Sequence, residues 1–207
     1  SGSVLSKLAV GLDGQSLVAN SSVAAGVNWS SANIFTNKVA NSTTSSTAGE
    51  NITTETSIFS TTVNGSILGT SGAVRARLFV SNFSAGGGQT SVWFNANYGG
   101  QTVASIVFGS ITPQYNGTSK GILEFNILSN GSTTSQKNIL NLDLRSDILA
   151  DNTGVSFAST LGWRGYKSSV STVDSDAAQT IGMTVRFNVS GVATKLTYDG
   201  YTIEKIN

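Results

Sequence analysis

The sequence predicts an all-β protein, an antiparallel, jelly-roll-like β-sandwich preceded by an extended N-terminal arm. From residue 50 onward, runs of alternating apolar and polar residues are separated by Asn-Gly, Gly-Gly, Ser-Gly and Asp-Gly pairs. Such pairs are strong hairpin signals. No window repeats its apolar residues with the helical period of about 3.6. We therefore expect two packed antiparallel sheets with polar outer faces.

The chain divides into an arm and linker, residues 1–49, and a β-sandwich head, residues 50–207. In the arm, short apolar pieces are interrupted by Gly and Asp-Gly, so this ribbon buries little surface by itself. The stretch that follows Trp29 is rich in Ser, Thr and Asn. That composition is typical of a linker, and we expect it to hold one short strand.

The first half of the head contains three clear alternating runs. In the run 74–81, Val74, Ala76, Leu78 and Val80 face one way. In the run 92–98, apolar residues alternate with Trp93, Asn95 and Asn97, and the run 102–108 follows across Gly99-Gly100. We expect the second and third runs to pair as a hairpin.

The second half supplies the remaining strands. The runs 123–127 and 140–144 flank the turn sequence SNGSTTSQ and should pair with each other. The run 181–189 has the longest apolar row, and we expect it to return through Ser190-Gly191 into a strand at 195–205 with a bulge at Gly200. Between the runs 140–144 and 181–189, the weak alternation around WRGYK, residues 163–167, indicates a loop.

Composition limits the classes of function. Charged residues make up 11% of the chain and the net charge is +1, which indicates neither a nucleic-acid partner nor an anionic membrane. The chain has no His and no Cys, so the usual general base and the thiolate nucleophile are missing. No apolar run is long enough for a membrane span, and we expect no membrane insertion.

We therefore predict a non-enzymatic protein with no cofactor and no bound metal. The close pair Asp174 and Asp176 has too few further oxygen ligands nearby in the sequence for a calcium loop. Spacing alone does not exclude a glycosidase whose two carboxylates come from distant strands.

The arm carries the most specific pattern, GLDGQSLVANSSVAAGVNW. It resembles a motif that recurs in tail fibres and other adhesion or structural proteins of tailed bacteriophages. The matching positions are Gly11, Asp13, Gly14, Gln15, Leu17, Ala19, Asn20, Ser21, Gly26 and Trp29. Asn20 stands where that family often has Asp. The resemblance implies a homotrimeric fibre with a distal β-rich domain. Residues 50–81 and 198–205 likewise resemble β-sandwich domains at the ends of phage fibre proteins.

Two clusters are candidates for contact with a receptor or glycan. Trp93 lies on the same strand face as Asn95 and Asn97, and an outward Trp flanked by amides suits stacking on a sugar ring. A protomer interface or a covering loop would use it equally well. The cluster Trp163, Arg164 and Tyr166 has the composition of a binding hot spot. Its alternative is a buried Trp that pins the loop to the sandwich.

The sequence thus leads to one hypothesis with two alternatives. The hypothesis is the distal part of a phage tail fibre, exposed on the virion as a homotrimer, that binds a host cell-surface glycan or protein. Its arm would assemble three chains, or pack against the head, through Leu8, Val10, Leu17, Val27 and Trp29. The alternatives are a structural protein of a head fibre or capsid and a free carbohydrate-binding module.

Overall fold

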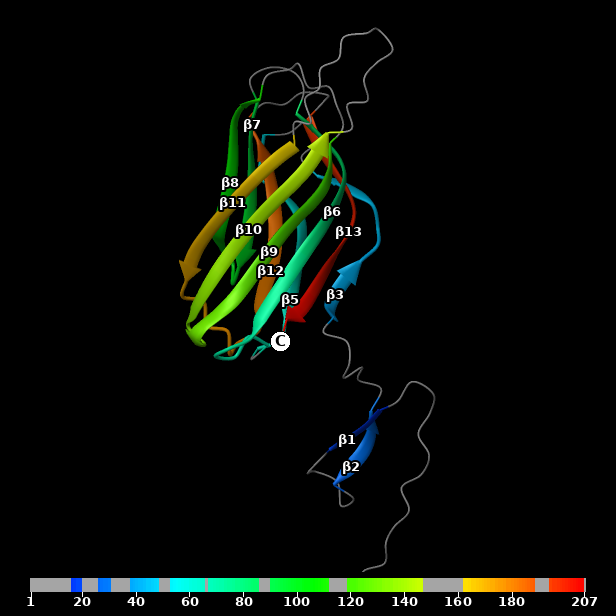
Figure 1. The fold of residues 1–207 in the computed structure, drawn as a ribbon, viewed down its shortest axis with the longest axis vertical. Coiled ribbons are helices and arrows are strands. Elements are labelled where there is room, and N and C mark those ends of the chain that lie inside the picture. Colours follow the sequence, from blue (N-terminus) through cyan, green and yellow to red (C-terminus); the bar gives the residue numbers. More distant parts are fainter. Residues whose placement is uncertain are drawn as a thin grey trace, which may run out of the picture. The chain divides into compact units, whose positions relative to one another are not determined.

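The structure, a computed structural model, describes residues 16–19, 26–30, 38–48, 53–65, 67–85, 90–111, 119–146, 162–188 and 194–206. Within these ranges every regular element is a β-strand (Figure 1). The predicted all-β class is confirmed.

The strands are β1 (Ser16–Ala19), β2 (Val27–Ser30), β3 (Lys38–Ser42), β4 (Ser46–Ala48), β5 (Thr56–Val63), β6 (Ala73–Ala85), β7 (Thr90–Tyr98), β8 (Gln101–Ile111), β9 (Ser119–Ser132), β10 (Ser135–Ser146), β11 (Gly162–Ser171), β12 (Gln179–Phe187) and β13 (Thr194–Ile206).

The chain separates into two compact units, Ser1–Asn37 and Lys38–Asn207. In the first unit β1 and β2 form an antiparallel hairpin that places Leu17 opposite Trp29. The second unit begins at Lys38 and not at the expected residue 50, because β3 and β4 both pair with β13. A run rich in Ser, Thr and Asn can join a sheet in this way, since the backbone supplies the hydrogen bonds that hold a strand.

The second unit is a sandwich of two sheets in which all neighbouring strands are antiparallel. The larger sheet has the order β11-β10-β9-β6-β13-β3, with β4 also on β13, and the smaller sheet has the order β5-β12-β7-β8. Figure 1 shows the larger sheet in front of the smaller one. The predicted antiparallel sandwich is confirmed. The connections β4 to β5, β5 to β6, β6 to β7, β8 to β9, β11 to β12 and β12 to β13 pass from one sheet to the other. The jelly-roll-like connectivity stays a prediction.

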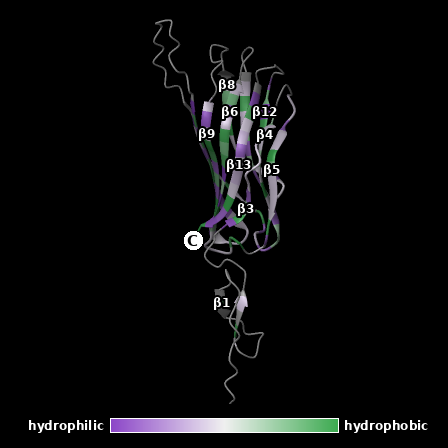
Figure 2. Ribbon diagram, turned by 90° about the vertical axis from the view of Figure 1, so that its right-hand side faces the viewer, coloured by the Kyte–Doolittle hydropathy of each residue, from purple (hydrophilic) through white to green (hydrophobic). Residues whose placement is uncertain are grey.

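The core lies between the two sheets. Hydrophobic and hydrophilic residues are interspersed along the same strands, as Figure 2 shows for β6, β9 and β13. The apolar members point inward, and Phe83 of the larger sheet meets Phe94 and Phe187 of the smaller one at ring distances of 5.5 and 6.3 Å. All three rings are at most 2% exposed. The period of two predicted from the sequence therefore defines the core.

Two of the predicted hairpins are present. β7 and β8 pair across the Gly99-Gly100 turn, and both glycines have positive φ values, 59° and 76°. β9 and β10 pair with Phe125 opposite Leu140 and Leu123 opposite Leu142. The bulge at Gly200 is also observed as a shift of register in β13.

The expected pairing of the 181–189 run with the last strand is wrong. β12 pairs with β5 and β7 in the smaller sheet, whereas β13 pairs with β6, β3 and β4 in the larger sheet. Val189 lies outside the described residues. Both strands have an inward apolar row, and such rows face each other across a core as readily as they lie side by side. Alternation alone therefore does not name a strand's partner.

The loop expected around WRGYK is also wrong, because these residues belong to β11. This strand pairs with β10 from Gln136 opposite Ser171 to Arg145 opposite Gly162. Its inner face packs against β8, where a Cβ at Gly165 would lie 2.6 Å from Ile106 Cγ2, and where the Ser169 hydroxyl donates to the Val103 carbonyl. Small inward residues fit this close approach, and their small size hides the alternation in the sequence.

Candidate functional site

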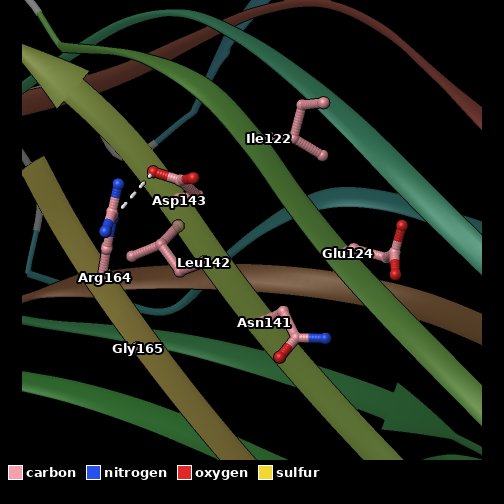
Figure 3. Close-up of a pocket in the computed structure, with 7 residues that line it drawn as sticks. All are labelled: Ile122, Glu124, Asn141, Leu142, Asp143, Arg164 and Gly165. Atoms are coloured by element: carbon pink, nitrogen blue, oxygen red, sulfur yellow. Dashed lines mark ion pairs between the residues drawn. The ribbon is translucent and has the colours of Figure 1, made fainter.

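The candidate site is an open depression on the outer face of the larger sheet (Figure 3). Its volume is about 560 Å³, and β9, β10 and β11 form its floor. The lining residues are Ile122, Glu124, Asn141, Leu142, Asp143, Arg164 and Gly165. The depression is therefore built on strands and not on loops.

Strand alternation places the functional side chains here. On β10, Leu140, Leu142 and Leu144 are buried, so the intervening Asn141 and Asp143 point outward. β9 repeats the pattern: Leu123, Phe125 and Ile127 are buried. Its outward side chains include Ile122 and Glu124, which Figure 3 shows on the strand beside Asn141 and Asp143. The same period that fills the core thus fixes the chemistry of the outer face.

The register arranges these side chains in two cross-strand rows. In the first row Asn141 lies opposite Tyr166 on β11 and opposite Glu124 on β9, and Glu124 lies opposite Arg77 on β6. The second row is parallel to the first and contains Arg164, Asp143, Ile122 and Phe79. Side chains directly opposite each other in antiparallel strands are close enough to act on one ligand.

Ion pairs connect the members of these rows. Arg164 Nε lies 3.4 Å from Asp143 Oδ1, the pair marked in Figure 3, and Arg145 lies 3.7 Å from Asp143 Oδ2. The side chains of Arg164 and Arg145 are 72% and 74% exposed. Water screens such pairs, so they contribute little to stability. Both guanidinium groups are accessible to a ligand.

Glu124 accepts two side-chain hydrogen bonds at shorter distances than the ion pairs of Asp143. Arg77 Nε donates to Glu124 Oε2 over 2.7 Å, and Asn126 Nδ2 donates to Oε1 over 2.8 Å. Burial raises the pKa of Glu124, but the hydrogen bonds from Asn126 and Arg77 and the positive charges of Arg77 and Arg75 outweigh it, so the pKa lies below its usual value. The carboxylate is therefore ionised near neutral pH and serves as a hydrogen-bond acceptor.

The two rows also contain exposed apolar side chains. Tyr166 is 64% exposed, and the adjacent pair Phe79 and Ile122 is 40% and 41% exposed. A ring of this kind offers a flat apolar face, while amide, carboxylate and guanidinium groups beside it form directional hydrogen bonds. This combination suits a ligand that carries both hydroxyl groups and apolar ring faces, as a sugar does.

The three predicted contact residues of β7 lie elsewhere, on the outer face of the smaller sheet. The Arg186 guanidinium lies 4.1 Å from the centre of the Trp93 ring, a cation–π contact. Asn95 Nδ2 donates to Glu55 Oε1 over 2.8 Å, and Asn97 Oδ1 accepts from the Thr102 hydroxyl over 2.8 Å. These side chains therefore already have partners within the protein. Their contact with a glycan stays a prediction.

Glu55 anchors that second face. Hydrogen bonds from the Thr184 hydroxyl and from Asn95, together with the charge of Arg186, hold the pKa of Glu55 below its usual value, although burial acts in the opposite direction. The two outer faces thus each contain an ionised glutamate that accepts two side-chain hydrogen bonds. The depression described above lies on the face of the larger sheet.

The structure divides the WRGYK cluster between the two faces of β11. Trp163 points inward, with ring distances of 5.9 Å to Phe83 and 5.3 Å to Phe108, both edge to face. Arg164 and Tyr166 point outward; Arg164 lines the depression, and Tyr166 lies opposite Asn141, another lining residue. The alternative of a Trp that pins this segment to the sandwich thus describes its packing. Contact of Arg164 and Tyr166 with a receptor or glycan stays a prediction.

The predicted assembly residues belong to the first unit. Leu17 is 48% exposed, whereas Val27 and Trp29 are partly buried. Leu8 and Val10 lie outside the described residues. Assembly through these five residues stays a prediction.

Sequence reasoning missed four side chains of the depression as functional residues: Ile122, Glu124, Asn141 and Asp143. Glu124, Asn141 and Asp143 occupy the polar positions of the runs 123–127 and 140–144, whereas Ile122 precedes the first run. These side chains lie together only because the strands have the order β11-β10-β9-β6, and this order could not be predicted from the sequence. Among the described residues, no group of three or more His, Cys, Asp or Glu is arranged to hold a metal ion, and no helix is long and apolar enough to cross a membrane.

No protein-family model matches the chain, and no curated protein matches it in sequence. Among solved structures, the chain is similar to the CBM2 module of the evolved Dit protein of Lactobacillus casei BL23 phage J-1, with 14% identity over 70% of this chain and 67% of that chain and a TM-score of 0.34. It is also similar to the alginate lyase of Klebsiella pneumoniae, with 8% identity over 67% of this chain and 60% of that chain and a TM-score of 0.28. The chain thus spans less than two thirds of the lyase.

Proposed function

We propose that this chain is the receptor-binding part of a bacteriophage tail fibre, exposed on the virion, and that it binds a host-surface carbohydrate without catalysing a reaction. The observation that carries the carbohydrate assignment is the depression on the larger sheet. Asn141, Asp143 and Arg164 line it, and the exposed ring of Tyr166 lies opposite Asn141 on the neighbouring strand β11. The resemblance of residues 11–29 to phage fibre motifs supports the assignment to a fibre.

In the proposed complex a sugar ring lies on Tyr166, and its hydroxyl groups bond to the side chains of the two rows. Asn141 offers both a donor and an acceptor, and Arg164 offers donors only. Ionised Glu124 closes the far side of the depression as an acceptor. The missing His and Cys support a binding role, because the chain has neither the usual general base nor a thiolate.

The test is binding of the whole chain to an array of bacterial surface glycans, repeated with Tyr166→Ala and Asn141→Ala. We expect each variant to bind about tenfold more weakly, because loss of an aromatic contact or of a hydrogen-bonding side chain has that effect. Val170→Ala is the matched control, since Val170 lies outward on the same strand and is 67% exposed against 64% for Tyr166. Absence of binding to any glycan would refute the proposal.

Trp93→Ala separates the two faces in the same assay. If glycan binding depended on Trp93 and not on Tyr166, the site would lie on the smaller sheet. If Trp93→Ala retains glycan binding and Tyr166→Ala loses it, the result supports a glycan site in the depression on the larger sheet.

We also propose that the first unit assembles three chains. An isolated two-stranded hairpin is marginally stable in water, and Leu17 of the β1–β2 hairpin is 48% exposed. Burial of such residues against identical copies would stabilise the hairpin. Sedimentation equilibrium of the whole chain tests this: a trimer that Leu17→Ser weakens is expected. A stable monomer of the unaltered chain at micromolar concentration would contradict it.

A further inference from the structure

Two exposed apolar groups lie at opposite ends of the rows on the outer face of the larger sheet. At the β11 end Tyr166 is 64% exposed. At the β6 end Phe79 lies opposite Ile122 of β9, and these side chains are 40% and 41% exposed. Phe79 points outward, since Leu78 and Val80 on either side of it are buried. The face therefore has two separate places where the apolar face of a sugar ring can pack.

These two apolar groups are too far apart for one sugar ring. β10 and β9 lie between β11 and β6 in the order of the sheet, so three interstrand spacings separate Tyr166 from Phe79. At about 4.8 Å for each spacing, the backbones of the two residues are roughly 14 Å apart. A six-membered sugar ring is similar in width to the ring of a Tyr side chain and spans only part of this distance. A ligand that contacts both apolar groups therefore contains several linked sugars.

The positions between the two apolar groups hold side chains that form hydrogen bonds. Asn141 lies opposite Tyr166, and Asp143 lies opposite Ile122. Glu124 lies opposite Asn141, and its carboxylate is fixed by the two side-chain hydrogen bonds that it accepts. Linked sugars present the matching groups along their length, namely apolar ring faces and hydroxyl groups.

The two rows also end in a way that lets a long ligand continue. β11 is the first strand in the order of the larger sheet. At the other end, the residue opposite Phe79 on β13 is Gly200, which has no side chain. A Cβ at Gly200 would lie 2.2 Å from the Ser42 carbonyl oxygen, and its φ is +146°, so a larger residue would be strained there. Among the described strands, the rows thus end at an edge strand and at a glycine, and a polymer can extend past both.

We propose that the depression binds an internal segment of a linear polysaccharide, which runs across the strands from Tyr166 to the pair Phe79 and Ile122. This inference rests on the proposed function, which places a sugar ring on Tyr166, and it adds a second ring position at Phe79. The class of ligand is therefore a chain of linked sugars and not a single terminal sugar.

Fragments of different length test this class of ligand. The probes are fragments of one to six sugars from three linear polymers, of α-1,4-glucose, β-1,3-glucose and β-1,4-N-acetylglucosamine, together with the glycans of the array. Frontal affinity chromatography on the immobilised whole chain measures the affinity for each fragment. Within a series that binds, we expect the affinity to rise about tenfold or more with length, because a second ring contact is added, and then to stay constant.

Substitutions at the two ends separate the two contacts. Phe79→Ala and Ile122→Ala should each weaken binding of the long fragments about fivefold and leave the shortest bound fragment unaffected, because they remove only the distant contact. Tyr166→Ala should weaken binding of every fragment. Val170→Ala is the control, since Val170 is 67% exposed on the same face and lies opposite Lys137, outside the two rows. All variants are compared at a temperature where circular dichroism shows them to be folded.

The possible outcomes separate the inference from the proposed function. An affinity that rises with length, and that loses this rise in Phe79→Ala but not in the control, supports the inference. Equal affinity for short and long fragments, or equal binding of every fragment and array glycan by Phe79→Ala and the unaltered chain, overturns it but leaves a carbohydrate-binding protein. A Phe79→Ala variant that differs only in its oligomeric state in sedimentation also overturns it, because the pair would then contact another copy of the chain. Failure to bind every fragment and every glycan of the array refutes both.

Discussion

Trp163 and Tyr166 lie on opposite faces of one strand. Truncation to Ala should therefore reduce stability at Trp163 and glycan binding at Tyr166. Trp163 packs edge to face on Phe83 and Phe108 between the sheets, whereas Tyr166 is 64% exposed. Removal of a core Trp side chain costs about 3–5 kcal/mol. Trp163 is partly buried, so Trp163→Ala should cost about 3 kcal/mol, the lower end of that range. Tyr166→Ala should change stability by about 0.5 kcal/mol or less.

Thermal unfolding followed by circular dichroism measures this difference. For a domain of 150–250 residues, about 3 kcal/mol corresponds to a decrease in Tm of roughly 6–12 °C. We therefore expect this decrease for Trp163→Ala and an unchanged Tm for Tyr166→Ala, while glycan binding at a temperature where both variants are folded falls only for Tyr166→Ala. The assignment of Trp163 to the core would be refuted if its truncation cost less than about 1 kcal/mol in urea unfolding.

Three further predictions concern stability. Gly99→Ala should lower the free energy of unfolding more than Gly100→Ala in urea titrations, because both have positive φ but only at Gly99 would a Cβ meet a side chain, that of Val173. Glu124 has a pKa below its usual 4.5, so its stabilisation is complete above pH 4.5 and is lost as the pH falls through the lowered pKa. Glu124→Gln should lack this part of the acid sensitivity, and an unchanged pH profile would contradict the assignment. Burial raises the pKa of Tyr98 from 10.0 to about 12, so stability is lost as the pH rises from 10 toward 12. The Tyr98→Phe variant should lose less stability than the unaltered chain as the pH rises over this range, as measured by urea unfolding.

The alternation in the sequence predicted the class of fold, two hairpins and the inward rows, because a period of two directly gives the two faces of a strand. Beyond those two hairpins, it did not predict which strands share a sheet. β12 and β13 belong to different sheets, and the sequence contains no signal that distinguishes this arrangement from a hairpin. Strand order comes from packing of the whole domain, which local patterns do not encode.

The site was predictable only in part for the same reason. Arg164 and Tyr166 were selected for their residue types, and both border the depression. Trp163 was selected with them because the small inward residues Gly165 and Ser169 hide the strand alternation of β11, so that the segment was interpreted as a loop. Asn141 and Asp143 are the polar members of the alternating run 140–144, but only the register of β10 with β9 and β11 brings them together with the other lining residues.

Because the depression lies on paired strands, different residues of the same strands form the core and the surface of the depression. Inward positions such as Leu142 and Leu144 must keep the core, while the outward positions between and beside them contribute little to folding. Substitutions at Asn141, Asp143, Arg164 or Tyr166 should therefore cost little stability, and under the proposed function they would change which carbohydrate is bound. Under that same proposal, a phage would change its host range by single outward substitutions, without altering the fold that presents them.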